Sequence, residues 1–521
     1  MAHDPSHLRT EALVGVVPSP PRAVRLSLDT ATIGDFLHDE SKLAATGVAS
    51  LAIPDSLPAL REALAWHAHA HHVVSVSGSR TGVAGGAVPE AASHLVSLAE
   101  LRGVTQVREE DGVWSATVLG GTWLSELNDY LGAHHPTLRF PVDPTETSAS
   151  LGGMVATNAG GARSFRYGST RAWVEGLTIE LPSARTLSLR RGRERSVDSV
   201  LWLVDVGPPR RLSIPPIAKP STKNAVGYGF DADGDAIDLW IGAEGTLGVV
   251  SEVVVRLRCV EGGELGYLQF FDDVGAAFRY VQLLRRDDRL CPSAIEFLDA
   301  RSHALARESG KQAVERVLRL AHDAACSVFV EVEYGGEEEL VAATERLWEH
   351  VAAVGADPDA SVAGTDAEEL RDVRAFRHAV PERINAIIAS RREQHPGLHK
   401  IATDMAVPDD ALSWVFTRYQ TVLAEAGLDF AVFGHVGDNH FHVNILPRDE
   451  SELERAMGCY AMLAEEIVAR GGAVAAEHGI GRIKRGFLPL QYSPETMAAF
   501  RAIKRWVDPE WRFNRGILLD P

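Results

Sequence analysis

The sequence has few cysteines and no long apolar run. Its 521 residues contain only Cys259, Cys291, Cys326 and Cys459, which lie far apart and form no CxxC pair. That spacing excludes an iron–sulfur module within this chain and argues against a disulfide framework. No apolar stretch approaches about 18 residues, so no transmembrane segment is expected.

Positive charge is also scarce. Lys+Arg number 52 against 71 Asp+Glu, a net charge of −19, and only seven of the 52 cations are lysines. This balance argues against a nucleic-acid partner. Hydrophobic residues at 45% and charged residues at 24% are typical of a globular protein. The first residues, MAHDPSHLRTEALVGVV, lack the pattern of a secretory signal. We therefore expect a cytoplasmic protein, docked at most peripherally at the inner face of the membrane.

Composition along the chain predicts several parts. Residues 1–34 form an N-terminal extension, and 35–259 hold short strands and glycine-rich loops. Within the latter, 190–222 combines an Arg cluster (Arg190, Arg191, Arg193, Arg195) with GPPRRLSIPPIAKP. Prolines at that density exclude helix or central strand, so a surface insertion or linker with a solvated Arg cluster is expected. In 260–475, strands alternate with long amphipathic helices, which predicts an α/β domain with an antiparallel sheet. We expect 476–521 to fold back onto the first domain.

Three glycine-rich stretches stand in the first domain. GSRTGVAGGA (78–87) directly follows a predicted strand, and its small residues let backbone N–H groups converge on an anion such as a diphosphate. Its spacing is not GxGxxG and no helix follows at once, so a doubly wound nucleotide fold is disfavoured. PVDPTETSASLGGMVATNAGG (141–161) and GAEGTLGVVSE (242–252) follow it. A ligand-free turn could explain any one of these stretches, but the three together favour a large planar ligand.

In this order, the three stretches resemble the flavin-binding domain of the vanillyl-alcohol-oxidase/PCMH-type FAD family. The nearest likeness is to FAD-linked D-2-hydroxyacid dehydrogenases: D-lactate dehydrogenase, D-2-hydroxyglutarate dehydrogenase and the glycolate oxidase FAD subunit. The resemblance spans roughly 35–521, apart from 190–222. It implies an α+β fold, in which a PCMH-type FAD-binding domain of two α+β subdomains is joined to an α/β cap domain whose antiparallel sheet covers the flavin.

The resemblance also implies which residues hold FAD. The first loop would hold the diphosphate, the second would line the diphosphate and the isoalloxazine, and the third would contact the adenine side. Asn514 in RFNRGIL resembles a terminal family motif and is expected to have a cofactor or capping role. Relatives that attach FAD covalently often use a His in the first loop, where this chain has Arg80 and Thr81, so we predict non-covalent FAD. The full predicted set is Ser77, Gly78, Ser79, Arg80, Thr81, Gly82, Gly86, Ala87, Pro141, Asp143, Thr147, Gly152, Gly153, Thr157, Asn158, Gly160, Gly161, Glu244, Gly245, Gly248, Val250 and Asn514.

A histidine-rich segment, AVFGHVGDNHFHVNIL (431–446), has two β-rich arms around a turn. If Asp438-Asn439 is a two-residue hairpin turn, His435 lies directly opposite His442. Cross-strand partners are about 4.5–5.5 Å apart, which suits two imidazoles that share a metal. His440 would point the same way. A lone histidine is usually a satisfied core or surface residue, but three on one face favour a metal site.

A second segment, AAEHGIGRIKRGFL (475–488), places Glu477 and His478 side by side. Two histidines and one carboxylate leave an open position, as in a catalytic zinc site. The family resemblance assigns His435, His442 and Glu477 as ligands of a divalent metal and His478 as the catalytic base. Zinc fits best, with manganese and iron as alternatives. His440 stands where many relatives have another residue, which leaves open whether it joins the metal or tunes it.

A substrate carboxylate needs a cation, and RDVRAFRHAVPERINA offers two arginines. Arg377 matches an arginine motif of the family, and its guanidinium fork suits a carboxylate. Lys400 is a second candidate, for which a surface role is equally open. Pro381 replaces a hydroxyl found in hydroxyglutarate relatives, which argues against a substrate with a distal carboxylate.

The resemblance implies FAD-dependent oxidation of a small D-2-hydroxy acid to the 2-oxo acid. His478 would take the hydroxyl proton, the hydride would pass to flavin N5, and D-lactate is favoured as substrate. D-2-hydroxyglutarate and glycolate remain alternatives, as do a non-redox enzyme like alkylglycerone-phosphate synthase and a non-catalytic flavoprotein subunit. The electron acceptor stays open among oxygen, a quinone, a cytochrome, an electron-transfer flavoprotein and a separate iron–sulfur subunit. A homodimer is also left open.

Overall fold

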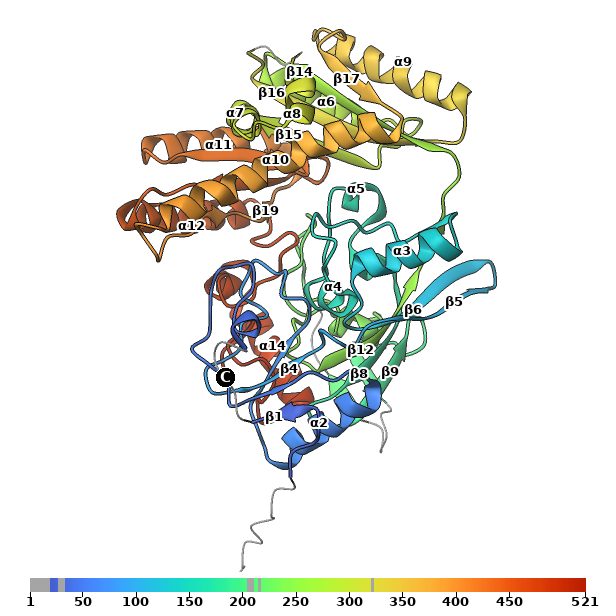
Figure 1. Ribbon diagram of the computed structural model, residues 1–521, viewed down its shortest axis with the longest axis vertical. Helices are drawn as coiled ribbons and strands as arrows, with labels where there is room; N and C mark the ends of the chain where they lie inside the picture. The colour runs from blue at the N-terminus through green and yellow to red at the C-terminus, as the bar shows by residue number, and fades with distance from the viewer. Residues whose placement is uncertain (1–18, 27–32, 204–209, 214–216, 320–322) are drawn as a thin grey trace, which may run out of the picture.

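The chain forms two lobes stacked along its long axis in a computed structural model (Figure 1). The structure describes residues 19–26, 33–203, 210–213, 217–319 and 323–521. Most of the predicted N-terminal extension lies outside these residues. Within them, no helix combines the length and the apolarity needed to cross a membrane.

The first lobe begins with a four-stranded sheet of order β1-β2-β4-β3. Strands β2, β3 and β4 are parallel, and β1 pairs antiparallel with β2. Apolar residues of α2, such as Leu60 and Leu64, pack against Val96 of this sheet. Strand β3 ends at Ser77, so the first glycine-rich loop leaves the carboxyl end of a parallel strand. The bounds are β1 Val24–Arg25, η1 Gly34–Phe36, β2 Ser50–Ala52, α2 Leu57–His69, β3 Val74–Ser77 and β4 His94–Ser97.

A five-stranded antiparallel sheet of order β5-β6-β12-β8-β9 forms the other half of this lobe. Helix α4, which carries part of the second glycine-rich stretch, packs on β12. The lobe therefore consists of two α+β units, as the resemblance implies. The bounds are β5 Val104–Glu110, β6 Val113–Leu119, α3 Leu124–His134, β7 Leu138–Arg139, α4 Leu151–Thr157, α5 Ser164–Tyr167, η2 Thr170–Ala172, β8 Val174–Glu180, β9 Thr186–Arg190, η3 Ala236–Leu239, β12 Val249–Arg256 and β13 Arg258–Cys259.

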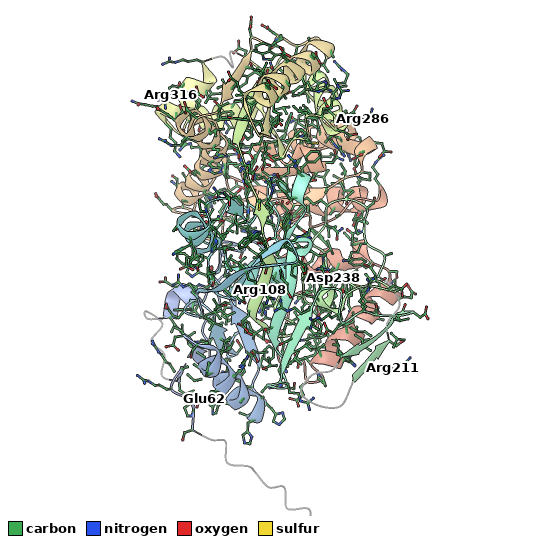
Figure 2. All side chains as sticks on the ribbon, turned by 90° about the vertical axis from the view of Figure 1, so that its right-hand side faces the viewer. Glu62, Arg108, Arg211, Asp238, Arg286 and Arg316 are labelled. Atoms are coloured by element: carbon green, nitrogen blue, oxygen red, sulfur yellow. The ribbon has the colours of Figure 1, made fainter. Side chains whose placement is uncertain are left out.

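The described residues of segment 190–222 include regular structure. It contains a hairpin, β10 (Val200–Leu203) paired with β11 (Arg210–Ser213), which buries Leu201 and Leu212. Arg191 donates from Nε to Val174 O at 2.8 Å and lies 3.3 Å from Asp238. The prediction of a solvated Arg cluster is wrong for Arg191, because the partly buried carboxylate of Asp238 in η3 pairs with it. Asp238 lies within the lower lobe in Figure 2.

The second lobe is built on an eight-stranded antiparallel sheet of order β17-β14-β16-β15-β20-β21-β18, with β19 also pairing with β21. Several helices begin at an Asp whose side chain accepts the first backbone N–H groups, as Asp299 does from Ser302 at 2.7 Å. The bounds are β14 Gly263–Phe271, α6 Val274–Arg285, β15 Ala294–Asp299, α7 Ala300–Arg307, α8 Gln312–Leu318, β16 Cys326–Tyr334, α9 Glu337–Ala353, β17 Ser361–Gly364, α10 Ala367–Arg391, β18 Ile401–Ala402, β19 Met405–Ala406, η4 Asp409–Ala411, α11 Leu412–Glu425, β20 Phe430–Gly434, η5 Val436–Asp438, β21 His440–Ile445 and α12 Glu450–Ala469.

The C-terminal segment runs from the second lobe back to the first (Figure 1). After η6 (Arg485–Phe487), α13 (Leu488–Gln491) and α14 (Pro494–Val507), Phe513 forms a parallel bridge with Val74 of β3. Asn514 accepts from Val76 N at 2.7 Å and donates to Glu244 O at 2.8 Å. It therefore ties the strand that leads into the first loop to the third glycine-rich stretch.

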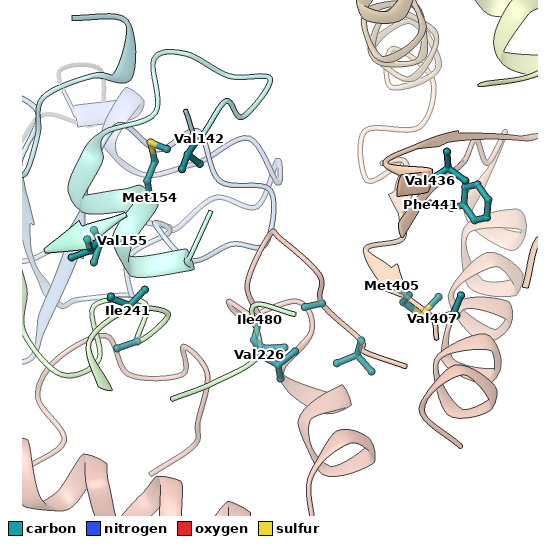
Figure 3. Packing of buried hydrophobic residues seen from close by; sticks show 14 of the residues in the cluster. Val142, Met154, Val155, Val226, Ile241, Met405, Val407, Val436, Phe441 and Ile480 are labelled. Carbon is teal, nitrogen blue, oxygen red and sulfur yellow. The ribbon is translucent and has the colours of Figure 1, made fainter. Parts of the chain in front are cut away.

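One hydrophobic core runs through both lobes. Figure 3 shows Met154 in the first lobe, Phe441 in the second, and Ile480 with Val226 between them. All four belong to one cluster of buried residues. Because the lobes share this core, side chains from both are held in fixed positions at their junction.

Candidate functional site

A cavity of about 350 Å³ lies at the junction of the lobes. Its wall combines the three glycine-rich stretches of the first lobe with a cluster of titratable residues from the second lobe and the C-terminal segment. The predicted cofactor residues that line it are Ser77, Gly78, Ser79, Arg80, Thr81, Gly82, Gly86, Ala87, Gly152, Gly153, Thr157, Gly160, Gly161, Glu244, Gly245, Gly248, Val250 and Asn514. His435, His442, Glu477 and His478 line the same cavity.

Pro141, Asp143, Thr147 and Asn158 are predicted cofactor residues that do not line this cavity. Asp143 lies 3.5 Å from the Arg163 guanidinium, and Thr147 uses its carbonyl to accept from Ser125 N. Asn158 ends α4 in a left-handed conformation and accepts from Ser169 Oγ and Arg171 N. These residues support the second glycine-rich stretch on the side away from the cavity. The composition of that stretch did not distinguish them from the residues that line the cavity.

The first loop has the properties of an anion cradle. Ser77 Oγ, Ser79 Oγ and Arg80 Nη1 are buried there without hydrogen-bond partners, and such groups are costly unless a ligand meets them. A Cβ at Gly78 would lie 2.3 Å from Ser150 Oγ, so only glycine allows the two loops to approach. These residues fit the diphosphate of FAD, with backbone and hydroxyl donors around one cation.

Glu244 has a role that the sequence did not indicate. Its carboxyl oxygens accept from Ile480 N at 2.8 Å and Gly481 N at 2.7 Å. Burial raises the pKa of this carboxyl to about 7. Glu244 therefore joins the third glycine-rich stretch to the turn that follows Glu477 and His478, and it couples the cofactor wall to the titratable cluster.

The titratable cluster brings together the predicted metal ligands. His435 Nε2 lies 3.2 Å from His442 Nε2 and 3.2 Å from Glu477 Oε2, and His442 Nε2 lies 3.9 Å from the same oxygen. Zn–N distances of about 2.0–2.1 Å in a tetrahedral site correspond to N···N separations of about 3.3 Å. These three residues therefore fit one divalent metal ion.

The backbone geometry that brings His435 and His442 together differs from the predicted hairpin. The turn is a 3-10 turn over Val436–Asp438, and Asn439 is left-handed with φ 52°. Phe433, not His435, is the strand partner of His442, so the predicted hairpin register is wrong by two residues. Gly434, at φ 130°, ends the strand early, and His435 lies beyond the ladder with its ring edge-on to His442.

Glu296, which the sequence analysis missed, orients His435. Its Oε1 lies 2.6 Å from His435 Nδ1, so Nε2 is left facing the cluster. Burial opposes protonation of His435, but Glu296 and Glu477 together raise its pKa to about 10. The available signal was an acidic residue in the interior of the strand AIEFLD, between apolar neighbours.

Asp404, also missed, holds the segment that carries Glu477 and His478. This fully buried carboxylate accepts from Glu477 N at 3.1 Å and from His478 N at 2.9 Å. It pairs with Lys484 Nζ at 2.5 Å and lies 3.1 Å from His440 Nε2. Burial disfavours the charge, yet His478, Lys484 and the hydrogen bond from His440 hold the pKa of Asp404 well below its usual range.

Lys223 is a third residue that the sequence did not single out. Its ammonium group pairs with Glu477, lies 3.1 Å from Asp438 and donates to Gly161 O at 3.3 Å. It follows directly after segment 190–222, whose composition indicated only a linker. Lys223 therefore brings a cation to the cluster.

The predicted substrate cations do not line the cavity. Arg377 lies on α10, and its Nη1 is 3.3 Å from Glu296 Oε2. Glu296 therefore stands between Arg377 and His435. Arg374 pairs with Glu264 and lies 3.3 Å from Glu331. Lys400 is partly buried, and burial lowers its pKa to about 8.

His440 lies between the cluster and Asp404, with a nitrogen within 4.8 Å of the other candidate ligands.

The two lobes and this cavity fit the flavin-binding fold that the sequence resembles. An FAD binding domain matches residues 48–190, and the C-terminal domain of FAD linked oxidases matches 266–518. The chain belongs to this family of FAD-linked oxidases, within the group that includes D-2-hydroxyacid, lactate and glycolate dehydrogenases.

Similar proteins support this assignment. The chain is 28% identical over 509 residues to a D-2-hydroxyglutarate dehydrogenase of Xanthomonas citri pv. viticola, covering 96% of this chain and 95% of that protein. It is 27% identical to a D-lactate dehydrogenase of Anaerostipes hadrus, covering 85% and 83%. Among solved structures, p-cresol methylhydroxylase has a TM-score of 0.70 at 13% identity, covering 96% and 94%. An alkyldihydroxyacetonephosphate synthase has a TM-score of 0.65 at 16% identity, covering 95% and 82%. These two structures establish the fold alone.

Proposed function

We propose that this protein oxidises a small D-2-hydroxy acid, with D-lactate as the favoured substrate, to the 2-oxo acid. The observation that carries the proposal is the position of four residues, His435, His442, Glu477 and His478, in the wall of the cavity that the glycine-rich loops form. A metal-binding set and a base beside the flavin-binding loops suit removal of a proton from the substrate hydroxyl and of a hydride from the carbon that bears it.

The residues divide into a cofactor set and a metal set. Ser77, Ser79 and Arg80 would bind the diphosphate of FAD, which supplies a hydride acceptor at N5. His435, His442 and Glu477 would hold a divalent metal, for which zinc fits best with manganese and iron as alternatives, and which lowers the pKa of a bound hydroxyl.

His478 is the proposed catalytic base. Its ring stacks parallel to that of His442, with centroids 5.4 Å apart, and its Nδ1 lies 3.6 Å from Asp404. Burial lowers the pKa of His478 to about 4, so the ring is neutral near pH 7 and can take the hydroxyl proton. Asp404 accepts from the backbone N of His478, and its charge favours the imidazolium that forms.

The charges around the cluster suit a metal and an anionic substrate together. With the ligand histidines neutral, as metal binding requires, four carboxylates face three cations, a balance of −1. A divalent metal then brings the site to +1, and a substrate carboxylate brings it to zero. The groups counted are Glu296, Asp404, Asp438, Glu477, Lys223, Arg377 and Lys484.

The arginines of α10 favour a substrate with one carboxylate. Arg374 and Arg377 both pair with carboxylates of the second-lobe sheet, which would compete with a distal substrate carboxylate for these guanidinium groups. Pro381 supplies no hydroxyl there. D-2-hydroxyglutarate and glycolate remain the alternatives, and Arg377 would act on a substrate carboxylate only by exchanging Glu296 for it.

Metal binding at the cluster can be tested apart from turnover. His442→Ala should lower the affinity for Zn²⁺ by more than about 100-fold, because loss of hydrogen-bonded neighbours of a ligand alone costs 10–100-fold. Metal content after equilibration with Zn²⁺ and desalting measures this, and FAD absorbance should be retained. His134→Ala, an exposed histidine of α3, is the matched control. Equal metal content in both variants would contradict the proposed ligand set.

A further inference from the structure

A second histidine cluster lies in the first lobe, away from the cavity. His67 is in the last turn of α2, His72 precedes β3, and His94 is the first residue of β4. Each offers a ring nitrogen within 4.8 Å of the others. None of them lines the cavity at the lobe junction.

The distances within this cluster suit a metal. His67 Nδ1 lies 3.2 Å from His72 Nδ1, close to the roughly 3.3 Å that two imidazoles on one tetrahedral zinc require. Ser50 Oγ lies 2.7 Å from His94 Nδ1, which leaves Nε2 as the nitrogen available to a metal. The backbone holds the three residues together, since His72 N donates to His67 O and His94 N to Val73 O.

The environment of the cluster favours neutral imidazoles. His67 is buried, and its Nε2 has no hydrogen-bond partner, so no neighbouring acceptor holds a second proton on this ring. Burial and the Arg512 guanidinium disfavour the protonated imidazoles. Glu510 lies 3.2 Å from Arg512 Nε, so a carboxylate offsets this positive charge. Three neutral imidazoles with available lone pairs are the ligands that late divalent transition metals prefer.

We propose that His67, His72 and His94 form a second metal site, which takes a divalent transition metal such as Zn²⁺. The rings of His72 and His94 stack with centroids 3.7 Å apart, so one ring turns about its Cβ–Cγ bond when the metal binds. Water completes the coordination at the outer side, where His72 and His94 are partly exposed.

The position of this site indicates a structural role. Val74 pairs with His94 at the start of β3, and the same strand ends at Ser77, where the first glycine-rich loop begins. A metal would fasten the end of α2 to the amino-terminal ends of β3 and β4, opposite the carboxyl end that carries the loop. It would also secure the C-terminal segment, because Arg512 Nη1 donates to His67 O and the backbone carbonyl of Arg512 accepts from Val74 N.

The test uses a background that removes the other candidate metal site. The full-length double variant His442→Ala/Glu477→Gln is stripped with chelator, equilibrated with Zn²⁺ and desalted, and its zinc content and thermal midpoint are measured. We expect about one zinc per chain and a rise in midpoint on zinc addition. Adding His94→Ala should reduce zinc affinity by more than about 100-fold and abolish the rise.

His69→Ala in the same background is the matched control, since His69 belongs to the same histidine-rich run but is exposed and outside the cluster. It should bind zinc as the background does. If His94→Ala does not fold, His72→Ala replaces it at a partly exposed loop position. A background protein that takes up no zinc, or one whose zinc is indifferent to His94 and His72, would overturn the proposal.

Discussion

Replacing His478 by alanine is expected to leave a protein that still binds FAD but whose flavin is reduced by substrate about 100- to 10,000-fold more slowly. General acid–base catalysis contributes rate factors of that size. His478 is held by Asp404 beside His442, so its loss removes the proton acceptor and leaves the cofactor loops intact. Anaerobic stopped-flow absorbance of the flavin band measures the rate.

Two observations separate a base from a merely structural residue. Added imidazole should restore part of the reduction rate in His478→Ala, because it can occupy the space and accept the proton. The FAD content should match that of the unaltered protein. Reduction at the normal rate in His478→Ala would remove this residue from the role of base.

Replacing Asp404 by alanine should lower the free energy of unfolding by about 3–5 kcal/mol, because it leaves the ammonium group of Lys484 buried without its counter-charge. The amides of Glu477 and His478 lose their acceptor at the same time. Chemical denaturation of the purified protein measures the change. The turn that carries the metal ligand and the base should loosen, so flavin reduction should slow as well.

The controls for this prediction lie nearby. Asp410→Ala removes an exposed carboxylate from the same connection and should change stability by less than about 0.5 kcal/mol. The double variant Asp404→Asn/Lys484→Met, which removes both charges, should be more stable than Asp404→Ala. If Asp404→Ala unfolds like Asp410→Ala, the carboxylate does not hold the turn.

The glycine-rich loops could be predicted from sequence because their requirement is local. Gly78 must lack a side chain where Ser150 approaches, and Ser77 with Ser79 must offer hydroxyls at the end of a strand. The amino-acid composition of the loop reflects both requirements. The positions behind the loop, such as Asp143 and Asn158, carry similar residue types but point elsewhere, and sequence does not show that difference.

The metal cluster was predictable in its members and not in its geometry. The prediction grouped His435 with His442 through a hairpin register that is wrong, since Gly434 ends β20 early and a 3-10 turn follows. The two rings still meet, because both lie at the same end of the sheet. The side chains are long enough to approach each other, although the predicted backbone pairing was wrong by two residues.

The buried charges that position the cluster could not be read from local sequence. Glu296, Asp404 and Lys223 come from separate strands and connections, and each reaches the site only through tertiary packing. An acidic residue within an apolar strand was the one local signal, and it applies to Glu296. Lys223 gave none, because the proline-rich stretch before it suggested a linker.

The most direct test of the proposed function is an anaerobic visible spectrum of the purified protein during addition of D-lactate, L-lactate, glycolate and D-2-hydroxyglutarate in turn, with and without chelator. We expect D-lactate to bleach the flavin band rapidly, L-lactate to leave it unchanged, and chelation to abolish the bleaching. A yellow, metal-containing protein whose flavin none of these acids reduces would contradict the proposed reaction.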